Sequence, residues 1–391
     1  MVGSALAAAL MLPALADKRD DKETDSQASA KAALGQAVFF DPSLSSPPGQ
    51  SCATCHATNA AFVDPDRSLP VSKGVLQGRV GNRNTPTAMY AAFSPDFHYD
   101  EEEGLYVGGQ FLDGRAATLE EQAKGPFLNP LEMANPDKRS VVEKVRRTAY
   151  GADFDTVFGK GALDDTDAAY ERIAEALAAF ERTPQFSPFS SKYDAYLAGK
   201  ARLSKQEMRG LRLFEAEDKG NCAACHPSQP GPKGEPPLFT DFTYDNLGVP
   251  RNPDNPFYTL PAQLNPAGAQ WVDRGLGAVV EKRAEDGKFK VPTLRNIELT
   301  APYMHNGYFK TLRGTVVFYN DRDRKPLCKT NRVVEEAALQ QQCWPAPEVI
   351  ANVNQDELGD LGLTEREIDD IVAFMKTLTD GWTDKPVSPG P

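Results

Sequence analysis

The chain has 391 residues, of which 40% are hydrophobic and 25% are charged, and this balance is typical of a globular protein of two or three domains. Acidic residues (55) outnumber Lys and Arg (43), and the formal net charge of −12 argues against nucleic acid or an anionic membrane as a partner. The chain has only six cysteines and four histidines, so each of them can be followed individually.

The first segment predicts export. Residues 1–16 carry no charged side chain, and an apolar run over residues 5–15 ends in Ala14-Leu15-Ala16. This pattern is typical of a secretory signal peptide, although the usual basic start is missing, and a frayed apolar tail is the alternative. No other segment approaches the ~20 apolar residues that span a bilayer, so we predict no membrane span. Residues 17–31 are polar, and we predict that they are disordered.

The clearest chemistry lies in two CxxCH motifs, Cys52-Ala53-Thr54-Cys55-His56 and Cys222-Ala223-Ala224-Cys225-His226. Two thiols three residues apart reach the two vinyl groups of one haem, and the following histidine then falls under the iron. A zinc site would need four ligands, and a redox CxxC would not need a histidine beside the second cysteine in both copies. We therefore predict two covalent c-type haems, which agrees with export because such haems are attached outside the cytoplasm. The attachment and iron-ligand residues are Cys52, Cys55, His56, Cys222, Cys225 and His226.

The remaining cysteines, Cys328 and Cys343, are predicted to form a disulfide in an oxidising compartment, with two free thiols as the alternative. Only His98 and His305 are then left for other roles.

The pattern of expected helices indicates that the chain consists of two similar halves. Short amphipathic helices over residues 34–40 and 209–214 precede the motifs, and longer helices over residues 167–183 and 364–377 close the halves, the last behind a Thr364/Glu367 capping box. We predict a mainly α fold of two cytochrome c-like haem domains from an internal duplication, with long loops. The domains cover residues 32–186 and 187–380, with a linker near residues 184–188, an irregular stretch over residues 227–256 and a tail over residues 381–391.

A second match between the halves runs at a common spacing of 193 residues. Asp113-Gly114 corresponds to Asn306-Gly307, and Thr118-Leu119 corresponds to Thr311-Leu312. At that spacing Pro126 falls opposite Tyr319. Proline offers no donor to iron, whereas tyrosine offers a phenolate. The first haem would then have an open face suited to a small oxidant, and the second would be held by His226 and Tyr319 and would transfer electrons.

The sequence at this point resembles the bacterial dihaem cytochrome c peroxidase superfamily, over residues 34–379. The motifs that carry the resemblance are Ser51 to His56, Arg83-Asn84-Thr85-Pro86-Thr87, Gly108-Gly109-Gln110-Phe111, Leu128-Asn129-Pro130 with Glu132-Met133, Lys290 to Asn296, and Pro302-Tyr303-Met304-His305-Asn306-Gly307. The resemblance implies an N-terminal peroxidatic haem, a C-terminal electron-transfer haem and a calcium ion between them.

Within the superfamily the chain is most similar to the MauG-like branch. In that branch a tyrosine in a Phe-Tyr-Asn context replaces the methionine ligand of the ordinary peroxidases, and Tyr319 matches, with no methionine between Met304 and Met375. The ordinary peroxidases often carry a histidine in the loop after the first haem, but none lies between His56 and His98. The first haem is therefore expected to accept peroxide without prior reduction of the second.

The resemblance also implies roles for residues around the first haem. Gln122 and Glu132 would line the distal pocket beside Pro126, where a carboxylate can move a proton between the two peroxide oxygens. Calcium would be held by the Asn84 side chain and by the backbone carbonyls of Thr300 and Pro302, with waters. The resemblance gives His305 no ligand role; near the second haem it could bond to a propionate, and His98 is expected to be an ordinary loop histidine.

Two positions depart from the branch. The tryptophan expected between the haems is Leu112, so charge would tunnel directly or pass through Tyr106 or Tyr303. The surface tryptophan expected before the second motif is Gly220, which argues against maturation of a tryptophylquinone cofactor inside another protein.

Together these features predict a periplasmic dihaem peroxidase that reduces hydrogen peroxide. By the family precedent it would pass through high-valent states, a pair of Fe(IV) haems, and take electrons from an external donor, either a small redox protein or a partner-protein substrate. The alternatives are an oxidase that modifies a partner protein and a non-catalytic dihaem electron carrier.

Overall fold

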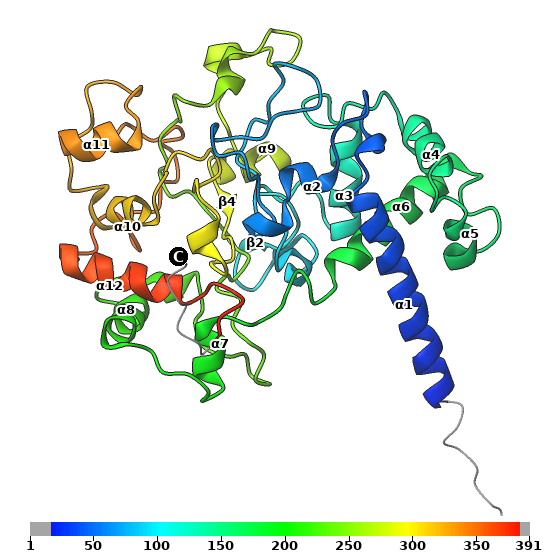
Figure 1. Ribbon diagram of the computed structural model, residues 1–391. Helices are drawn as coiled ribbons and strands as arrows, with labels where there is room; N and C mark the ends of the chain where they lie inside the picture. The colour runs from blue at the N-terminus through cyan, green and yellow to red at the C-terminus, as the bar shows by residue number, and fades with distance from the viewer. Residues whose placement is uncertain (1–16, 384–391) are drawn as a thin grey trace, which may run out of the picture.

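The structure is a computed structural model that describes residues 17–383 (Figure 1). The signal peptide predicted for residues 1–16 and the end of the predicted tail, residues 384–391, lie outside the described residues. The α-helices in the described range are α1 (Asp17–Phe39), α2 (Cys52–Cys55), α3 (Leu119–Leu128), α4 (Lys138–Arg146), α5 (Asp153–Phe158), α6 (Thr166–Glu181), α7 (Lys192–Leu197), α8 (Lys205–Glu215), α9 (Leu276–Val279), α10 (Leu312–Asp321), α11 (Glu335–Gln341) and α12 (Glu365–Lys376).

Short 3₁₀ helices and two small antiparallel sheets complete the described elements. The 3₁₀ helices are η1 (Pro42–Leu44), η2 (Thr58–Ala60), η3 (Ala91–Phe93), η4 (Cys222–Ala224), η5 (Pro256–Thr259), η6 (Gly268–Gln270), η7 (Arg283–Glu285) and η8 (Ile297–Leu299). The strands are β1 (His98–Asp100) paired with β2 (Leu105–Val107), and β3 (Tyr244–Asp245) paired with β4 (Phe289–Lys290). The predicted mainly helical class is confirmed.

In the first half, α1 packs along α6 because a glycine lets the two backbones meet. A methyl group on Gly35 would lie 1.8 Å from the carbonyl oxygen of Ala176, so no larger residue fits there. The phenyl rings of Phe39 and Phe180 meet edge to face with centroids 5.4 Å apart. The hydrophobic cluster built on this contact draws its buried residues from positions 34–186.

The prediction of disorder for residues 17–31 is wrong, because α1 runs without a break from Asp17 to Phe39. Lys31 forms an ion pair of 3.0 Å with Glu175 of α6. Once the C-terminal part of α1 has packed against α6, each further helical residue costs little free energy, because extending a helix is far easier than nucleating one. The N-terminal part of α1 extends away from the body of the molecule (Figure 1).

The second half repeats this contact with α8 and α12. A methyl group on Gly210 would lie 1.9 Å from the carbonyl oxygen of Asp370. The predicted capping box at the start of α12 is present, with Thr364 Oγ1 accepting from the Glu367 N–H. The buried residues of the second hydrophobic cluster come from positions 193–378, so each half has a core of its own.

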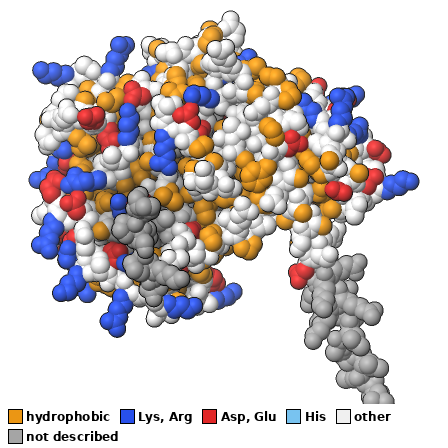
Figure 2. Space-filling view, viewed as in Figure 1, with side chains coloured by type: hydrophobic (Ala, Val, Ile, Leu, Met, Phe, Trp, Pro, Cys, Tyr) orange, Lys and Arg blue, Asp and Glu red, His pale blue; other side chains and the backbone are white. Residues whose placement is uncertain are grey.

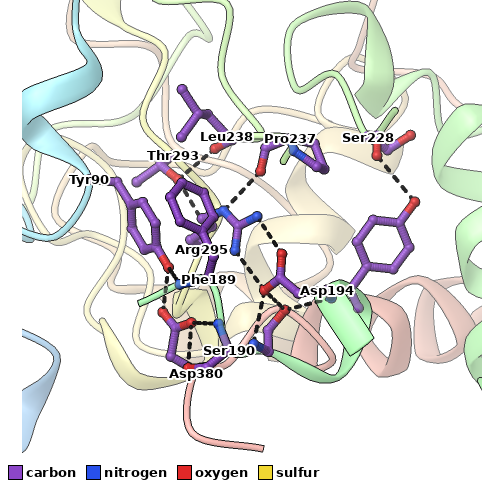
Figure 3. A network of polar contacts seen from close by, with 12 residues as sticks. Tyr90, Phe189, Ser190, Asp194, Ser228, Pro237, Leu238, Thr293, Arg295 and Asp380 are labelled. Atoms are coloured by element: carbon purple, nitrogen blue, oxygen red, sulfur yellow. Dashed lines mark hydrogen bonds and ion pairs between the residues drawn. The ribbon is translucent and has the colours of Figure 1, made fainter. Parts of the chain in front are cut away.

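The two halves are joined by backbone hydrogen bonds and by a polar network. The N–H of Lys290 in β4 donates to the carbonyl oxygen of Leu112 in the first half, at 2.9 Å. Figure 3 shows the network around Arg295, which is 1% exposed and forms a two-pronged ion pair with Asp194. The Asp380 carboxylate accepts from the hydroxyl of Tyr90 at 2.8 Å, so the end of the second half is anchored to the first.

The outer surface carries both signs of charge. Figure 2 shows basic and acidic side chains interspersed over the side formed by α8, α11 and α12. The predicted disulfide between Cys328 and Cys343 is confirmed, with the Cα atoms 5.0 Å apart. Among residues 17–383, no helix is both long enough and apolar enough to cross a bilayer.

Candidate active site

Both CxxCH motifs open into a single cavity of about 430 Å³ between the two halves. Its wall is formed by loops of both halves and by α3, α6, α10 and α12. Every site residue predicted from the sequence lies in this wall: Cys52, Cys55, His56, Asn84, Gln122, Pro126, Glu132, Cys222, Cys225, His226, Thr300, Pro302 and Tyr319. The cavity therefore brings together residues that are up to 267 positions apart in the chain.

The first motif forms α2, which begins at a capping box between Ser51 and Thr54. The N–H of His56 donates to the carbonyl oxygen of Cys52 at 2.9 Å, so one helical turn brings the histidine next to the cysteines. His56 Nδ1 lies 2.9 Å from the carbonyl oxygen of Phe62. Burial lowers the pKa of His56 against the opposing effect of this bond. The ring is thus neutral with its proton on Nδ1, which leaves the Nε2 lone pair for a metal.

The second motif repeats this arrangement on the 3₁₀ helix η4. The N–H of His226 donates to the carbonyl oxygen of Cys222 at 2.9 Å, and His226 Nδ1 lies 2.7 Å from the carbonyl oxygen of Phe239. Burial lowers the pKa of His226 to about 4, so this ring is also neutral at pH 7. Phe62 and Phe239 both have a left-handed backbone, with φ of 53° and 54°, which is rare for a bulky residue.

The four motif cysteines are not disulfide-bonded. Burial raises the pKa of Cys55, Cys222 and Cys225 to about 12. Within the described part of the chain, no three His, Cys, Asp or Glu side chains gather into a metal-binding cluster.

Pro126 and Tyr319 occupy the same place on corresponding helices. Thr118 caps α3 and Thr311 caps α10, each through its hydroxyl, and Pro126 and Tyr319 are both the eighth residue of their helix. Both side chains line the cavity. Burial raises the pKa of the Tyr319 phenol well above its usual value. Among the described residues its hydroxyl finds no hydrogen-bond partner, and an anionic phenolate there would need a cation beside it.

Gln122 and Glu132 lie on the same side of the cavity as Pro126. Gln122 is one turn before the proline on α3, and Glu132 follows the end of that helix. Burial raises the pKa of Glu132, against the lowering effects of Arg115 and of a 2.8 Å bond from Asn129 Nδ2. A buried carboxyl with a raised pKa accepts a proton more readily than an exposed one and can return it.

Three oxygen atoms in the cavity wall suit a hard cation. The Asn84 side chain donates from Nδ2 to the carbonyl oxygen of Pro70 at 3.0 Å, which turns its Oδ1 away from that bond. Within residues 17–383 this Oδ1 and the backbone oxygens of Thr300 and Pro302 make no hydrogen bond. Neutral amide and carbonyl oxygens of this kind are ligands of calcium.

The two other histidines have different surroundings. His98 is in the exposed hairpin of β1 and β2 and lies outside the cavity. His305 is buried, and its ring stacks on Phe289 with centroids 3.7 Å apart. His305 Nε2 and Glu348 Oε2 are 3.9 Å apart, and neither has a hydrogen-bond partner among the described residues. The predicted propionate contact of His305 remains a prediction.

Leu112 and Gly220, the two positions that depart from the expected pattern, both line the cavity. Leu112 lies in its wall beside Lys290, whose Nζ donates to the carbonyl oxygen of Gly109 at 2.8 Å. Tyr303 lines the cavity, whereas Tyr106 stacks against Phe97 on the outer hairpin.

Sequence reasoning did not identify several charged residues of the cavity wall. Arg83 pairs with Asp113 and Asp273, both at 2.6 Å, and the second partner is 190 residues away. Glu181 at the end of α6 also lies in the wall. The sequence contains no local signal for these contacts, because the partners come from distant segments.

The comparisons with known proteins agree with this geometry. The family model described as "Di-haem cytochrome c peroxidase" matches residues 29–202. The chain is 43% identical over 380 residues to the "Methylamine utilization protein MauG" of Paracoccus denitrificans, which covers 95% of this chain and 93% of that protein. It is 34% identical to the cytochrome c551 peroxidase of Nitrosomonas europaea, over 73% of this chain and 71% of that protein.

Among solved structures, the diheme peroxidase BthA of Burkholderia thailandensis matches with a TM-score of 0.74 and 35% identity, over 90% of this chain and 86% of that one. The chain therefore belongs to the di-haem cytochrome c peroxidase family, a family of oxidoreductases that carry two c-type haems.

Proposed function

We propose that this protein is a periplasmic dihaem c-type peroxidase that reduces hydrogen peroxide with electrons from an external donor protein. The observation that carries the proposal is the pairing of the two sites in one cavity. A histidine with a free Nε2 faces the cavity in each half, and the corresponding helix carries Pro126 in one half and Tyr319 in the other.

The motif residues fit two haems. In this proposal Cys52 and Cys55 hold one haem by thioether bonds, Cys222 and Cys225 hold the other, and His56 and His226 bind the irons. Each haem, when bound, supplies an iron that exchanges electrons. The repeated helix contacts at Gly35 and Gly210 support two domains, residues 32–186 and 187–380, that arose by internal duplication.

The residues beside Pro126 supply the proton chemistry. The proline ring presents no donor atom and leaves space for peroxide above the first site. Glu132 accepts the proton from one peroxide oxygen and returns it to the other, where water leaves. Gln122 binds the peroxide oxygens through its amide and keeps them within reach of Glu132. Two electrons from the donor and two protons from solvent complete the reduction of one peroxide to two waters.

Tyr319 and His226 both line the cavity and would bind the iron of the second haem. A site with two protein ligands cannot bind peroxide, and it is suited to receive electrons from the donor and pass them on. Binding to iron would also provide the cation that a buried phenolate requires. Between the sites, Asn84, Thr300 and Pro302 would hold calcium through one side-chain and two backbone oxygens.

A titration with peroxide tests the proposal. The purified, oxidised holoprotein should show one high-spin and one low-spin haem by electron paramagnetic resonance, and one equivalent of peroxide should remove the high-spin signal. Two low-spin haems that do not react with peroxide would refute it and support an electron carrier.

The ligand assignment needs its own variants. Tyr319→Phe should convert the low-spin signal to a high-spin one while both haems remain attached. Tyr303→Phe is the matched control, because Tyr303 also lines the cavity but donates its hydroxyl to the carbonyl oxygen of Ile297 at 2.9 Å. If Tyr319→Phe keeps the low-spin signal, Tyr319 is not the ligand.

A second candidate function is oxidation of a partner protein, which the 43% identity to the methylamine utilization protein favours. Against it, the surface tryptophan expected to draw electrons from a partner protein is Gly220 in this chain. The structure has no room for a side chain there, since a Cβ atom would lie 2.4 Å from the carbonyl oxygen of Leu213. The two functions differ in their products. A peroxidase turns over many equivalents of peroxide with a reduced small cytochrome, whereas a protein oxidase leaves a covalent change on its partner that mass spectrometry detects.

A further inference from the structure

A second buried carboxyl group lies in the wall of the first haem site, apart from Glu132. Glu181 is the last residue of α6, its side chain is 9% exposed, and it lines the cavity together with Leu177 one turn earlier. Cys52, a predicted point of haem attachment, lines the same cavity and packs against the hydrophobic cluster that includes Leu177.

Glu181 has no polar partner in the described part of the chain. Its neighbour Arg182 turns away and forms an ion pair of 2.6 Å with Glu120 of α3. A buried carboxyl without a hydrogen bond destabilises a fold by several kcal/mol when it is charged and by less when it is neutral.

The second half shows that the fold does not need a carboxyl at this position. Residues 176 of α6 and 370 of α12 receive the equivalent glycine contacts. The residue five positions further on is Glu181 in the first half and Met375 in the second, and both line the cavity. One turn earlier, Leu177 and Ile371 correspond and are both apolar. The carboxyl is therefore specific to the half with the open site.

We propose that Glu181 is a proton-coupling group of the N-terminal haem, which binds one proton when that site gains an electron and releases it when the electron leaves. This inference rests on the proposed function, because it requires a haem held by Cys52, Cys55 and His56.

The physical reason is the low dielectric of the cavity wall. An added electron in a site removed from water interacts strongly with any fixed negative charge nearby. Neutralising a neighbouring carboxylate removes that repulsion, so electron gain and proton binding favour each other. Burial, partly offset by Arg182 and reinforced by Glu120, raises the pKa of Glu181 to about 8, so both protonation states are accessible near neutral pH.

The charged groups that face Glu181 are few. Arg182 directly follows Glu181 at the end of α6, and Glu120 lies on α3; these two form an ion pair with each other. Glu132 is another titratable carboxyl of the cavity wall, which also contains Asp245, Asp273, Glu348 and Glu357. In the coupled step the iron goes from ferric to ferrous, the carboxylate and one solvent proton give a carboxylic acid, and the total charge of the site is unchanged.

The test is the midpoint potential of each haem as a function of pH, measured on the holoprotein by spectroelectrochemistry. The potential of the high-spin haem should fall as the pH rises through the range around pH 8, with a slope that approaches about 59 mV per unit, the value for one proton per electron. Glu181→Gln keeps the size and removes the titration, so its slope should become flat. The matched control is Glu175→Gln, a carboxyl of the same helix that is 45% exposed, pairs with Lys31 and lies outside the cavity wall, and this variant should keep the wild-type slope.

The possible results separate cleanly. A flat slope in the wild type, an unchanged slope in Glu181→Gln, or a slope lost only in Glu132→Gln would each overturn the inference. If Glu181→Gln fails to fold, redox-induced infrared difference spectra of the wild type decide, because the inference requires a carboxylic acid C=O band that grows on reduction. A count of covalent haems distinguishes failure of the proposed function, since a chain without the first haem has no such couple to measure.

Discussion

The buried ion pair between Arg295 and Asp194 offers a sharp test of how the fold is held. Arg295 Nη1 and Nη2 donate to the two carboxylate oxygens of Asp194 at 3.0 and 2.8 Å, and its Nε donates to the carbonyl oxygen of Pro237 at 2.8 Å. The guanidinium also lies over the rings of Tyr90 and Phe189, at 4.9 and 4.6 Å from their centroids (Figure 3). Asp194→Asn would leave this arginine charged and without its counter-ion.

The expected loss in the free energy of unfolding is about 3 kcal/mol. Removing one partner of a buried ion pair costs roughly 3–5 kcal/mol, and the lower end applies here because Arg295 keeps its bond to Pro237 and its two aromatic contacts. Burial tends to raise the pKa of Asp194, but its bonds to Arg295 hold it below the usual value. A lowered folded pKa stabilises the protein above the unfolded pKa of about 3.9, and that contribution is lost as the pH falls through the folded value.

Urea denaturation of the holoprotein, followed by circular dichroism and tryptophan fluorescence, measures this loss. The difference between wild type and Asp194→Asn should be complete at pH 7 and should shrink below about pH 4. The control is Asp167→Asn, which removes an ion pair with Lys138 whose aspartate is 80% exposed, and should leave the midpoint unchanged. If both variants unfold at the same urea concentration, the buried pair does not hold the fold as argued.

Three further predictions concern the cavity and its helices. Glu132→Gln should slow the reaction with peroxide by about 10²–10⁴-fold, measured by stopped-flow. Because burial raises the pKa of the carboxyl, the wild-type rate should rise as the pH rises through that raised pKa, whereas the rate of the variant should not depend on pH. Equal rates for the two proteins would exclude Glu132 as the base. Gly210→Ala should lower the melting temperature, because its Cβ atom would lie 1.9 Å from the carbonyl oxygen of Asp370 and overpacking costs about 1–3 kcal/mol; an unchanged melting temperature would mean that α8 and α12 can separate freely. Asn84→Ala should weaken calcium binding by at least about tenfold in calorimetric titration of the calcium-depleted holoprotein, and an unchanged affinity would exclude its side chain as a ligand.

Local patterns were predictable because their geometry depends on neighbouring residues alone. The spacing of Cys52, Cys55 and His56 already contains the turn that the Cys52 carbonyl closes, and the Thr364/Glu367 capping box marks the start of α12 by itself. The disulfide was predictable by elimination, since Cys328 and Cys343 were the only cysteines left. The disorder expected for residues 17–31 failed because composition says nothing about a helix that a neighbour such as α6 stabilises.

The sequence by itself therefore determined the motifs, the helical class and, through the 193-residue spacing, which residues share a structural position. Only the tertiary structure decided which of these residues meet, because burial and long-range contacts arise when distant segments pack together. It supplied the carbonyl groups that orient His56 and His226, and it put the carboxyl of Glu181 in the cavity wall where Met375 lies in the other half. A glutamate in an amphipathic helix looks like a solvent-facing residue until the cavity beside it is known.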